Sequence, residues 1–199
     1  MTNKDDSLAQ YLMGRMYYYG KGVTKDYKKA VEWYTKAAEQ GYVFAQYILG
    51  RLYRTGKGVT KDYKKAFGWC TKAAEQGFAC GQCSLGVMYY YGKGVTKDDK
   101  KAFEWYTKSA EQGYAHGQCH LGSMYYNGNG VTKDYKKAVE WYTKSAEKGN
   151  EFGQCNLATM YEFGNGVTMD KAKAVEWYTK AAEQGNADAT EALEALLED

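Results

Sequence analysis

The sequence predicts an all-α fold, a right-handed α-solenoid of antiparallel helix pairs. Three columns of residues recur at the same interval of 36 residues. The first column holds the tryptophans, Trp33, Trp69, Trp105, Trp141 and Trp177. The second holds small residues, Gly14, Gly50, Gly86, Gly122 and Ala158, and the third holds a glycine that precedes valine, Gly22, Gly58, Gly94, Gly130 and Gly166. A fixed period of this length is typical of helical repeat proteins.

The period divides the chain into five 36-residue repeats and a shorter end segment. The predicted repeats span residues 6–41, 42–77, 78–113, 114–149 and 150–185. Residues 186–199 are predicted to form a C-terminal capping helix. Glu194 stands there in the column of Gly14, and a charge in that column opposes close packing of a further helix.

The first helix of a repeat is predicted over residues 8–19 in the first repeat. Apolar residues with helical spacing form one stripe there, Ala9, Met13, Met16 and Tyr17. Gly14 lies in the middle of this helix, where glycine costs up to about 1 kcal/mol relative to alanine. We therefore expect another helix to pack closely against its backbone. Gly20 and Gly22 follow and are suited to end the helix, because glycine readily adopts a positive φ.

The second helix is predicted to start after Asp26, whose carboxylate is a good N-cap. Its apolar stripe consists of Tyr27, Ala30, Val31, Tyr34, Ala37 and Ala38. Gly41 is predicted to end it. Lysines on the opposite side, such as Lys28 and Lys29, form a ridge that we interpret as a solvated face balanced by glutamates. A surface for an acidic partner is the alternative interpretation of this ridge.

The third repeat contains LGVMYYYGKGVTKDDKKAFEWYTKSAEQG. This motif resembles the Sel1-like repeats, a branch of the tetratricopeptide-like helical solenoids. The resemblance recurs five times and covers about 180 of the 199 residues. It implies that the first helices of the repeats line a concave wall, where partners usually bind.

The five repeats differ from one another mainly in the first helix. The most variable columns, those of residues 8, 12, 15 and 19, lie on one helical stripe. Tyrosine and arginine, which are enriched at binding hot spots, occur there in the N-terminal repeats. The predicted partner-binding residues are Arg15, Tyr19, Arg51, Arg54, Tyr91, His116, His120 and Asn127. The alternative is sequence drift on a surface that packing does not constrain.

Cysteine and histidine side chains gather in the third and fourth repeats. These are Cys80, Cys83, His116, Cys119 and His120. They are metal-ligand types, but Cys83 and Cys119 share one column with Tyr11 and Tyr47, which favours a packing role. We expect no metal ion and no cofactor. The cysteine-rich bacterial branch of the family implies one disulfide per repeat, but the expected partner column holds alanines such as Ala38.

Several classes of function are disfavoured by the composition. The net charge of +3, from 27 basic and 24 acidic residues, is too balanced to predict nucleic-acid or membrane binding. The first ten residues lack the apolar core of a secretory signal, and no apolar run is long enough to span a bilayer. We therefore expect a cytoplasmic protein with reduced cysteines, or a segment of a larger one.

The sequence favours a non-catalytic scaffold or adaptor that binds protein segments. The Gly-Lys-Gly-Val turns lack the strand and the Lys-Ser/Thr ending of a phosphate loop. The arginines favour an acidic protein or peptide partner. The alternative function, a weak β-lactamase or cell-wall-fragment binder, is implied by the cysteine-rich branch alone. Leu8, Tyr11 and Leu12 are expected to be exposed and to allow weak self-association through the N-terminal repeat.

Overall fold

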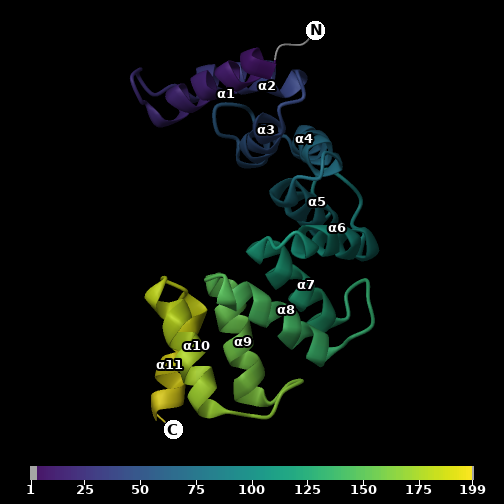
Figure 1. Cartoon of the computed structure of the whole chain (residues 1–199), viewed down its shortest axis with the longest axis vertical. Coiled ribbons are helices and arrows are strands. Elements are labelled where there is room, and N and C mark those ends of the chain that lie inside the picture. Colours follow the sequence, from purple (N-terminus) through teal and green to yellow (C-terminus); the bar gives the residue numbers. More distant parts are fainter. Residues whose placement is uncertain (1–3, 199) are drawn as a thin grey trace. The chain divides into compact units, whose positions relative to one another are not determined.

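The computed structural model describes residues 4–198, which form eleven α-helices and no β-strand (Figure 1). The helices are α1 Lys4–Tyr19, α2 Tyr27–Glu39, α3 Val43–Thr55, α4 Tyr63–Glu75, α5 Ala79–Tyr91, α6 Asp99–Glu111, α7 Ala115–Asn127, α8 Tyr135–Glu147, α9 Glu151–Phe163, α10 Lys171–Glu183 and α11 Ala187–Glu198. Two helices per repeat and one further C-terminal helix confirm the predicted all-α repeat fold. No helix in the described range is both long and apolar enough to cross a bilayer.

The chain divides into two compact units. The first unit ends at Asp98 and contains α1 to α5, and the second begins at Asp99 and contains α6 to α11. Within each unit, the two helices of a repeat pack against each other, and each second helix also packs on the first helix of the next repeat.

The second helices begin where the sequence predicts. The Asp26 carboxylate accepts hydrogen bonds from the backbone N–H groups of Lys28 and Lys29, at 3.0 Å each. Asp62, Asp134 and Asp170 cap α4, α8 and α10 in the same way. The first helices end at glycines with positive φ, as at Gly56 with 75°. The capping and turn predictions are therefore confirmed.

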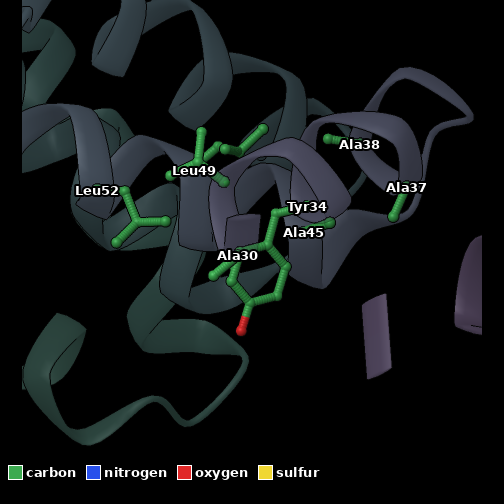
Figure 2. Close-up of a cluster of buried hydrophobic side chains, with 8 residues drawn as sticks. Ala30, Tyr34, Ala37, Ala38, Ala45, Leu49 and Leu52 are labelled. Carbon is green, nitrogen blue, oxygen red and sulfur yellow. The ribbon is translucent and has the colours of Figure 1, made fainter. Parts of the chain in front are cut away.

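Close approach explains the glycine in the middle of the first helix. A Cβ placed on Gly14 would lie 2.6 Å from Cδ1 of Tyr34, and one on Gly122 would lie 2.7 Å from Cδ1 of Tyr142. The second helix of the same repeat thus packs its aromatic ring directly on the glycine backbone. Figure 2 shows the core that results in the first unit, where Tyr34, Leu49 and Leu52 pack with small alanine side chains.

The second glycine of each turn has a role that the sequence analysis did not assign to it. It lies against the start of the second helix of the preceding repeat. A Cβ on Gly58 would collide with the carbonyl group of Tyr27, and one on Gly130 with that of Asp99. Gly22, in the first repeat, meets only the side chain of Met16, at 3.5 Å. The glycine therefore allows close packing between repeats, in addition to its part in the turn that follows the first helix.

The first helix differs from its prediction at its N-terminal end. It starts at Lys4 rather than residue 8. Ala9 is exposed, whereas its counterpart Ala45 is fully buried. In later repeats, the residue in the column of Ala9 packs on the second helix of the preceding repeat. For example, a Cβ placed on Gly153 would lie 2.7 Å from the Cβ of Ser145. No helix among the described residues precedes α1, so Ala9 has no such surface to contact.

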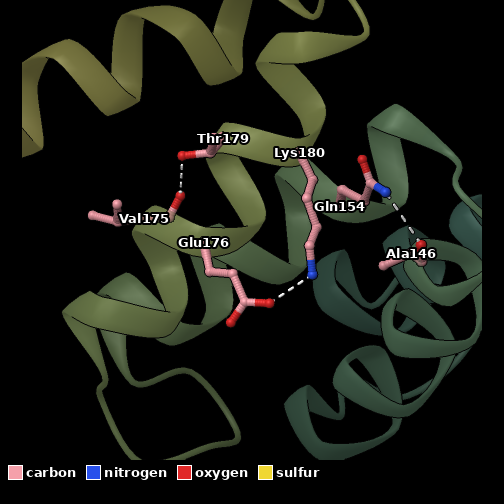
Figure 3. A network of polar contacts seen from close by, with 6 residues as sticks. All are labelled: Ala146, Gln154, Val175, Glu176, Thr179 and Lys180. Carbon is pink, nitrogen blue, oxygen red and sulfur yellow. Dashed lines mark hydrogen bonds and ion pairs between the residues drawn. The ribbon is translucent and has the colours of Figure 1, made fainter.

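Buried glutamines connect consecutive repeats. Nε2 of Gln46, near the start of α3, donates to the carbonyl of Ala38 at 3.1 Å. Gln154 repeats this bond to Ala146 at 3.3 Å (Figure 3). The same carbonyls also accept from the backbone N–H groups of Gly41 and Gly149, at 3.0 Å and 2.9 Å, so each glutamine adds a second donor from the next repeat.

The C-terminal helix α11 packs on α10. Ala189 is fully buried there, and Ala192, Leu193 and Leu196 pack on the same apolar cluster. Glu194 is exposed, as predicted for a capping helix.

Candidate partner-binding surface

The predicted binding residues lie on the first helices of four repeats. In the first unit, α1 carries Arg15 and Tyr19, α3 carries Arg51 and Arg54, and α5 carries Tyr91. All five side chains are exposed. In the second unit, α7 carries His116, His120 and Asn127, of which His120 is partly buried.

Three clefts occupy the same columns of the repeat. Each has walls from two consecutive first helices and a floor from the second helix between them. The α1/α3 cleft, of about 220 Å³, is lined by Tyr18, Tyr19, Tyr34, Ile48, Arg51, Leu52, Thr55 and Lys57. The α3/α5 cleft, of about 150 Å³, is lined by Arg51, Arg54, Cys70, Cys83, Ser84, Val87 and Met88. The α7/α9 cleft, of about 210 Å³, is lined by Ser123, Tyr126, Asn127, Tyr142, Asn156, Thr159 and Met160.

Two arginines of the first unit lie against neighbouring aromatic rings. The guanidinium carbon of Arg15 lies 5.9 Å from the ring centroids of both Tyr11 and Tyr19. That of Arg51 lies 5.8 Å from the ring of Tyr47. Cation–π contacts of this kind orient a guanidinium group without neutralising its charge. Arg51 lines both clefts of the first unit, so one cation faces two binding spaces.

Lys57 is a cationic residue of the α1/α3 cleft that the sequence analysis treated only as part of a turn. Its Nζ donates to the hydroxyl of Tyr18 at 3.1 Å and lies 4.3 Å from the ring centroid of Tyr27. Hydrogen bonding to these tyrosines raises the pKa of Lys57 above its usual value. Its column was a usable signal, because Lys57 and Lys93 are replaced by Asn129 and Asn165 in later repeats.

Tyr91 is 60% exposed and is not among the residues that line these clefts. Its ring meets that of Tyr90 edge to face at 4.9 Å. Nζ of Lys93 lies 5.1 Å from the centroid of Tyr91. Tyr91 therefore presents a flat, largely open aromatic face next to a positive charge.

The two histidines have different surroundings. The imidazole of His120 stacks on Tyr106, with centroids 4.8 Å apart and planes inclined by 19°. Burial lowers the pKa of His120 to about 4, so the ring is neutral at pH 7. His116 is exposed, and its Nδ1 lies 3.1 Å from Nδ2 of Asn150, the residue that caps α9. His120 is thus part of the packed framework, whereas His116 and Asn127 face outward.

All five cysteines are thiols rather than disulfides. Burial raises the pKa of Cys70 and of Cys119 to about 12, so both thiols keep their protons at neutral pH. Cys119 belongs to a buried apolar cluster with Tyr142 and Leu157. Within residues 4–198, no three His, Cys, Asp or Glu side chains are grouped so that they could hold a metal ion.

The N-terminal apolar patch contains two of the three residues expected there. Leu8 and Leu12 are 42% and 45% exposed. Tyr11 is instead half-buried, because its ring packs on Tyr42 at 5.0 Å and on Tyr34 at 5.8 Å between centroids. The expectation that Tyr11 is exposed is therefore wrong, since the following repeat covers its ring.

The chain is similar to known repeat proteins along most of its length. The family model described as Sel1 repeat matches residues 7–42, 43–78, 81–114, 115–150 and 152–186. A Sel1 repeat protein from Oxalobacter formigenes has 39% identity and a TM-score of 0.91, over 96% of this chain and 76% of its own. A protective antigen of uropathogenic Escherichia coli with an SLR fold has 45% identity and a TM-score of 0.86, over 96% of this chain.

Two of these relatives are much longer than the chain. The chain spans 41% of the Escherichia coli antigen. A sel1-like repeat-containing protein of Acanthamoeba polyphaga mimivirus is 51% identical over 35 residues, which are 18% of this chain and 6% of the viral protein.

Proposed function

The chain belongs to the Sel1 repeat family, and from this membership we propose that it is a non-catalytic scaffold or adaptor. Helical repeat proteins of this family are commonly protein-interaction scaffolds. The proposed binding surface runs along the first helices of the repeats, and its occupant is a segment of a partner protein.

One observation carries this proposal. Clefts recur at the same columns of the repeat, and side chains that are typical of binding hot spots line those of the first unit. In the first unit, the proposed contacts that line these clefts are Tyr19, Arg51 and Arg54. Arg15 on α1 and Tyr91 on α5 are proposed as further contacts outside the cleft linings. His116 and Asn127 are proposed as contacts in the second unit, with His120 supporting them from the framework.

The charge distribution supports an acidic partner for the first unit. Residues 7–19, 43–55 and 79–91 of its first helices contain three arginines and no aspartate or glutamate. An arginine fork pairs well with a carboxylate group. The partner segment is therefore proposed to be extended or helical, with acidic residues opposite the first two repeats.

The proposal is tested by affinity capture with the purified chain, followed by mass spectrometry and calorimetry with the captured protein. A variant with Arg51→Ala and Arg54→Ala should lose most of the binding. The matched control, Lys64→Ala with Lys65→Ala, changes two cations on α4 and should retain it. If the lysine pair is required and the arginine pair is not, the partner binds the lysine ridge and the proposed surface is wrong.

The β-lactamase alternative has no supporting contact. Nδ1 of His116 lies beside Nδ2 of Asn150, and the ring of His120 stacks on Tyr106, so neither of these contacts pairs an imidazole with a nucleophile. A nitrocefin assay of the same preparation separates the two proposals, and turnover that survives further purification would favour the alternative.

A further inference from the structure

The buried tyrosine at the floor of the α1/α3 cleft has no hydrogen-bond partner among the described residues. Tyr34 is 2% exposed, and its ring packs on the backbone of Gly14 and on the ring of Tyr11. Tyr34 lines the cleft, and in Figure 2 its hydroxyl oxygen points away from Leu49 and Ala38. The hydroxyl is not one of the buried atoms that lack a partner, so it is open to the cleft, where a ligand can replace water as its acceptor.

Two tyrosines in the same column show how the other repeats satisfy this hydroxyl. Tyr142 donates to Oγ of Ser123 at 3.1 Å. Tyr178 donates to Oε2 of Glu162 at 2.7 Å and lies 2.9 Å from Oγ1 of Thr159. The chain therefore already contains a carboxylate bound by the hydroxyl of this column.

The first repeat lacks these internal acceptors. Arg15 stands in the column of Ser123 and Thr159, and Tyr18 stands in the column of Glu162. Arginine is a donor without acceptor capacity, so it cannot accept the proton of Tyr34. Within this cleft, the hydroxyl of Tyr34 is therefore left to donate to water or to a bound ligand.

We propose that the α1/α3 cleft is a carboxylate-binding subsite for a partner segment, in which Tyr34 donates to the carboxylate and Arg51 and Lys57 balance its charge. This inference rests on the proposed function and identifies the chemistry of one contact within it. The carboxylate belongs to an acidic side chain or to the C-terminus of the partner.

Charge and shape agree with this occupant. Lys57 remains charged, and burial raises the pKa of Tyr34, so the hydroxyl keeps the proton that it donates. The apolar residues Ile48 and Leu52 line the same cleft and suit the methylene groups of a glutamate side chain. Because no acidic residue lies on α3 or on residues 7–19 of α1, no carboxylate of these helices competes for the cations.

The α7/α9 cleft provides an internal control. It uses the same columns, but Thr159 replaces Arg51, Asn156 replaces Ile48, and Ser123 already accepts from Tyr142. This cleft is neutral and its tyrosine is satisfied, so it is not expected to bind a carboxylate.

The test uses three tetrapeptides, titrated into the full chain at low salt and followed by NMR chemical shifts. The first is acetylated and amidated tetraglutamate, which has side-chain carboxylates. The second is acetylated tetraglutamine with a free C-terminus, and the third is the same peptide amidated, which has no carboxylate. The variants are Tyr34→Phe, Lys57→Gln and the control Tyr142→Phe.

At least one carboxylate peptide should bind, and the amidated glutamine peptide should not. Tyr34→Phe should weaken that binding about tenfold or more, as expected for a lost hydrogen bond to a charged group. Lys57→Gln should also weaken it, and Tyr142→Phe should leave it unchanged. The phenylalanine keeps the ring that packs on Gly14, so the melting temperature should not change and a folding defect would be recognised.

Two results would overturn the subsite. Either no carboxylate peptide binds, or Tyr34→Phe and Tyr142→Phe bind equally well. The proposed function is tested separately. It would be wrong if a captured partner protein bound the variant with Arg51→Ala and Arg54→Ala as well as it binds the wild type. If binding of the partner required the arginines but not Tyr34, the proposed scaffold function would stand and the proposed carboxylate subsite would be wrong.

Discussion

The backbone carbonyl of Tyr27 lies directly against Gly58, leaving no room for a β-carbon between them. The two residues belong to consecutive repeats, and their contact joins the turn of one repeat to the start of α2. Gly58 has a φ of 76°. Glycine is therefore needed here for two reasons, the positive φ and the closeness of the Tyr27 carbonyl.

Replacing Gly58 by alanine should therefore destabilise the fold more than a positive φ alone explains. Gly22 is the matched control, because it has the same φ of 76° without the backbone contact. We expect Gly22→Ala to lower the free energy of unfolding by about 1 kcal/mol, and Gly58→Ala by at least about 2 kcal/mol. Urea denaturation of both variants measures the difference. Equal losses would show that the contact with Tyr27 contributes nothing.

The arginine pair on α3 should matter for binding and not for folding. We expect Arg51→Ala with Arg54→Ala to weaken partner binding by roughly 1–3 kcal/mol, as for hot-spot arginines. Both side chains are exposed, so the unfolding free energy should change by no more than about 0.5 kcal/mol each. Calorimetry and thermal melting check the two effects. A large loss of stability would mean that the weaker binding reflects a folding defect and not the loss of a contact with the partner.

The stacked imidazole of His120 should make stability depend on pH. Its pKa is lowered to about 4 in the folded chain, below the unfolded value of about 6.5. The unfolded state therefore binds more protons between these two values. Its contribution to stability is complete above about pH 6.5 and decreases as the pH falls toward 4.

The variant His120→Phe keeps the ring stack and removes the titration. The wild-type chain should lose on the order of 2 kcal/mol more stability than this variant between pH 7 and pH 4.5. Urea denaturation at both pH values gives the comparison, with His116→Gln as a control for an exposed imidazole. Parallel pH profiles for wild type and His120→Phe would contradict the assignment.

The N-terminal apolar patch should support weak self-association. Leu12 is 45% exposed, and with Arg15, Met16, Tyr19 and Lys21 it lines a shallow depression of about 320 Å³. Light scattering at increasing concentration should show association for the wild type and a monomer for Leu12→Glu. Phe163→Glu, at a residue that is 63% exposed on α9, is the control. Identical behaviour of the two variants would place the contact elsewhere.

The cysteines should contribute by packing alone. Because burial keeps the thiols of Cys70 and Cys119 protonated, neither is prepared to ligate a metal. Thermal melting should be the same, within about 2 °C, with and without dithiothreitol and with EDTA. A decrease of several degrees with either reagent would indicate a disulfide or a bound metal.

The sequence predicts those features that depend on one repeat alone. Asp26 caps α2, Gly20 ends α1 and Gly14 receives Tyr34, because each of these effects arises from residues close in sequence or on one helix pair. Because the period is 36 residues, each such prediction applies to the equivalent position of every repeat. Features that depend on the neighbouring repeat were harder to predict.

Ala9, Tyr11 and Gly58 illustrate the difficulty. Ala9 follows the same pattern as the buried Ala45, yet it is exposed because no described helix precedes α1. Tyr11 is covered by Tyr42 from the next repeat. In the candidate site, the arginines were predicted from their residue type. Lys57 and Tyr34 were missed because their place in the α1/α3 cleft depends on how two repeats pack.

The glutamine bonds between repeats have a consequence for hydrogen exchange. Gln46 and Gln154 bond the ends of α2 and α8 to the following helix, so opening of these ends also breaks a bond between two repeats. Thr190 stands in this column on α11 and donates instead to Asn186 of its own segment. The end of α10 therefore lacks the glutamine anchor. Its amide protons should exchange with solvent sooner than those at the end of α8, and unfolding should progress inward from α11.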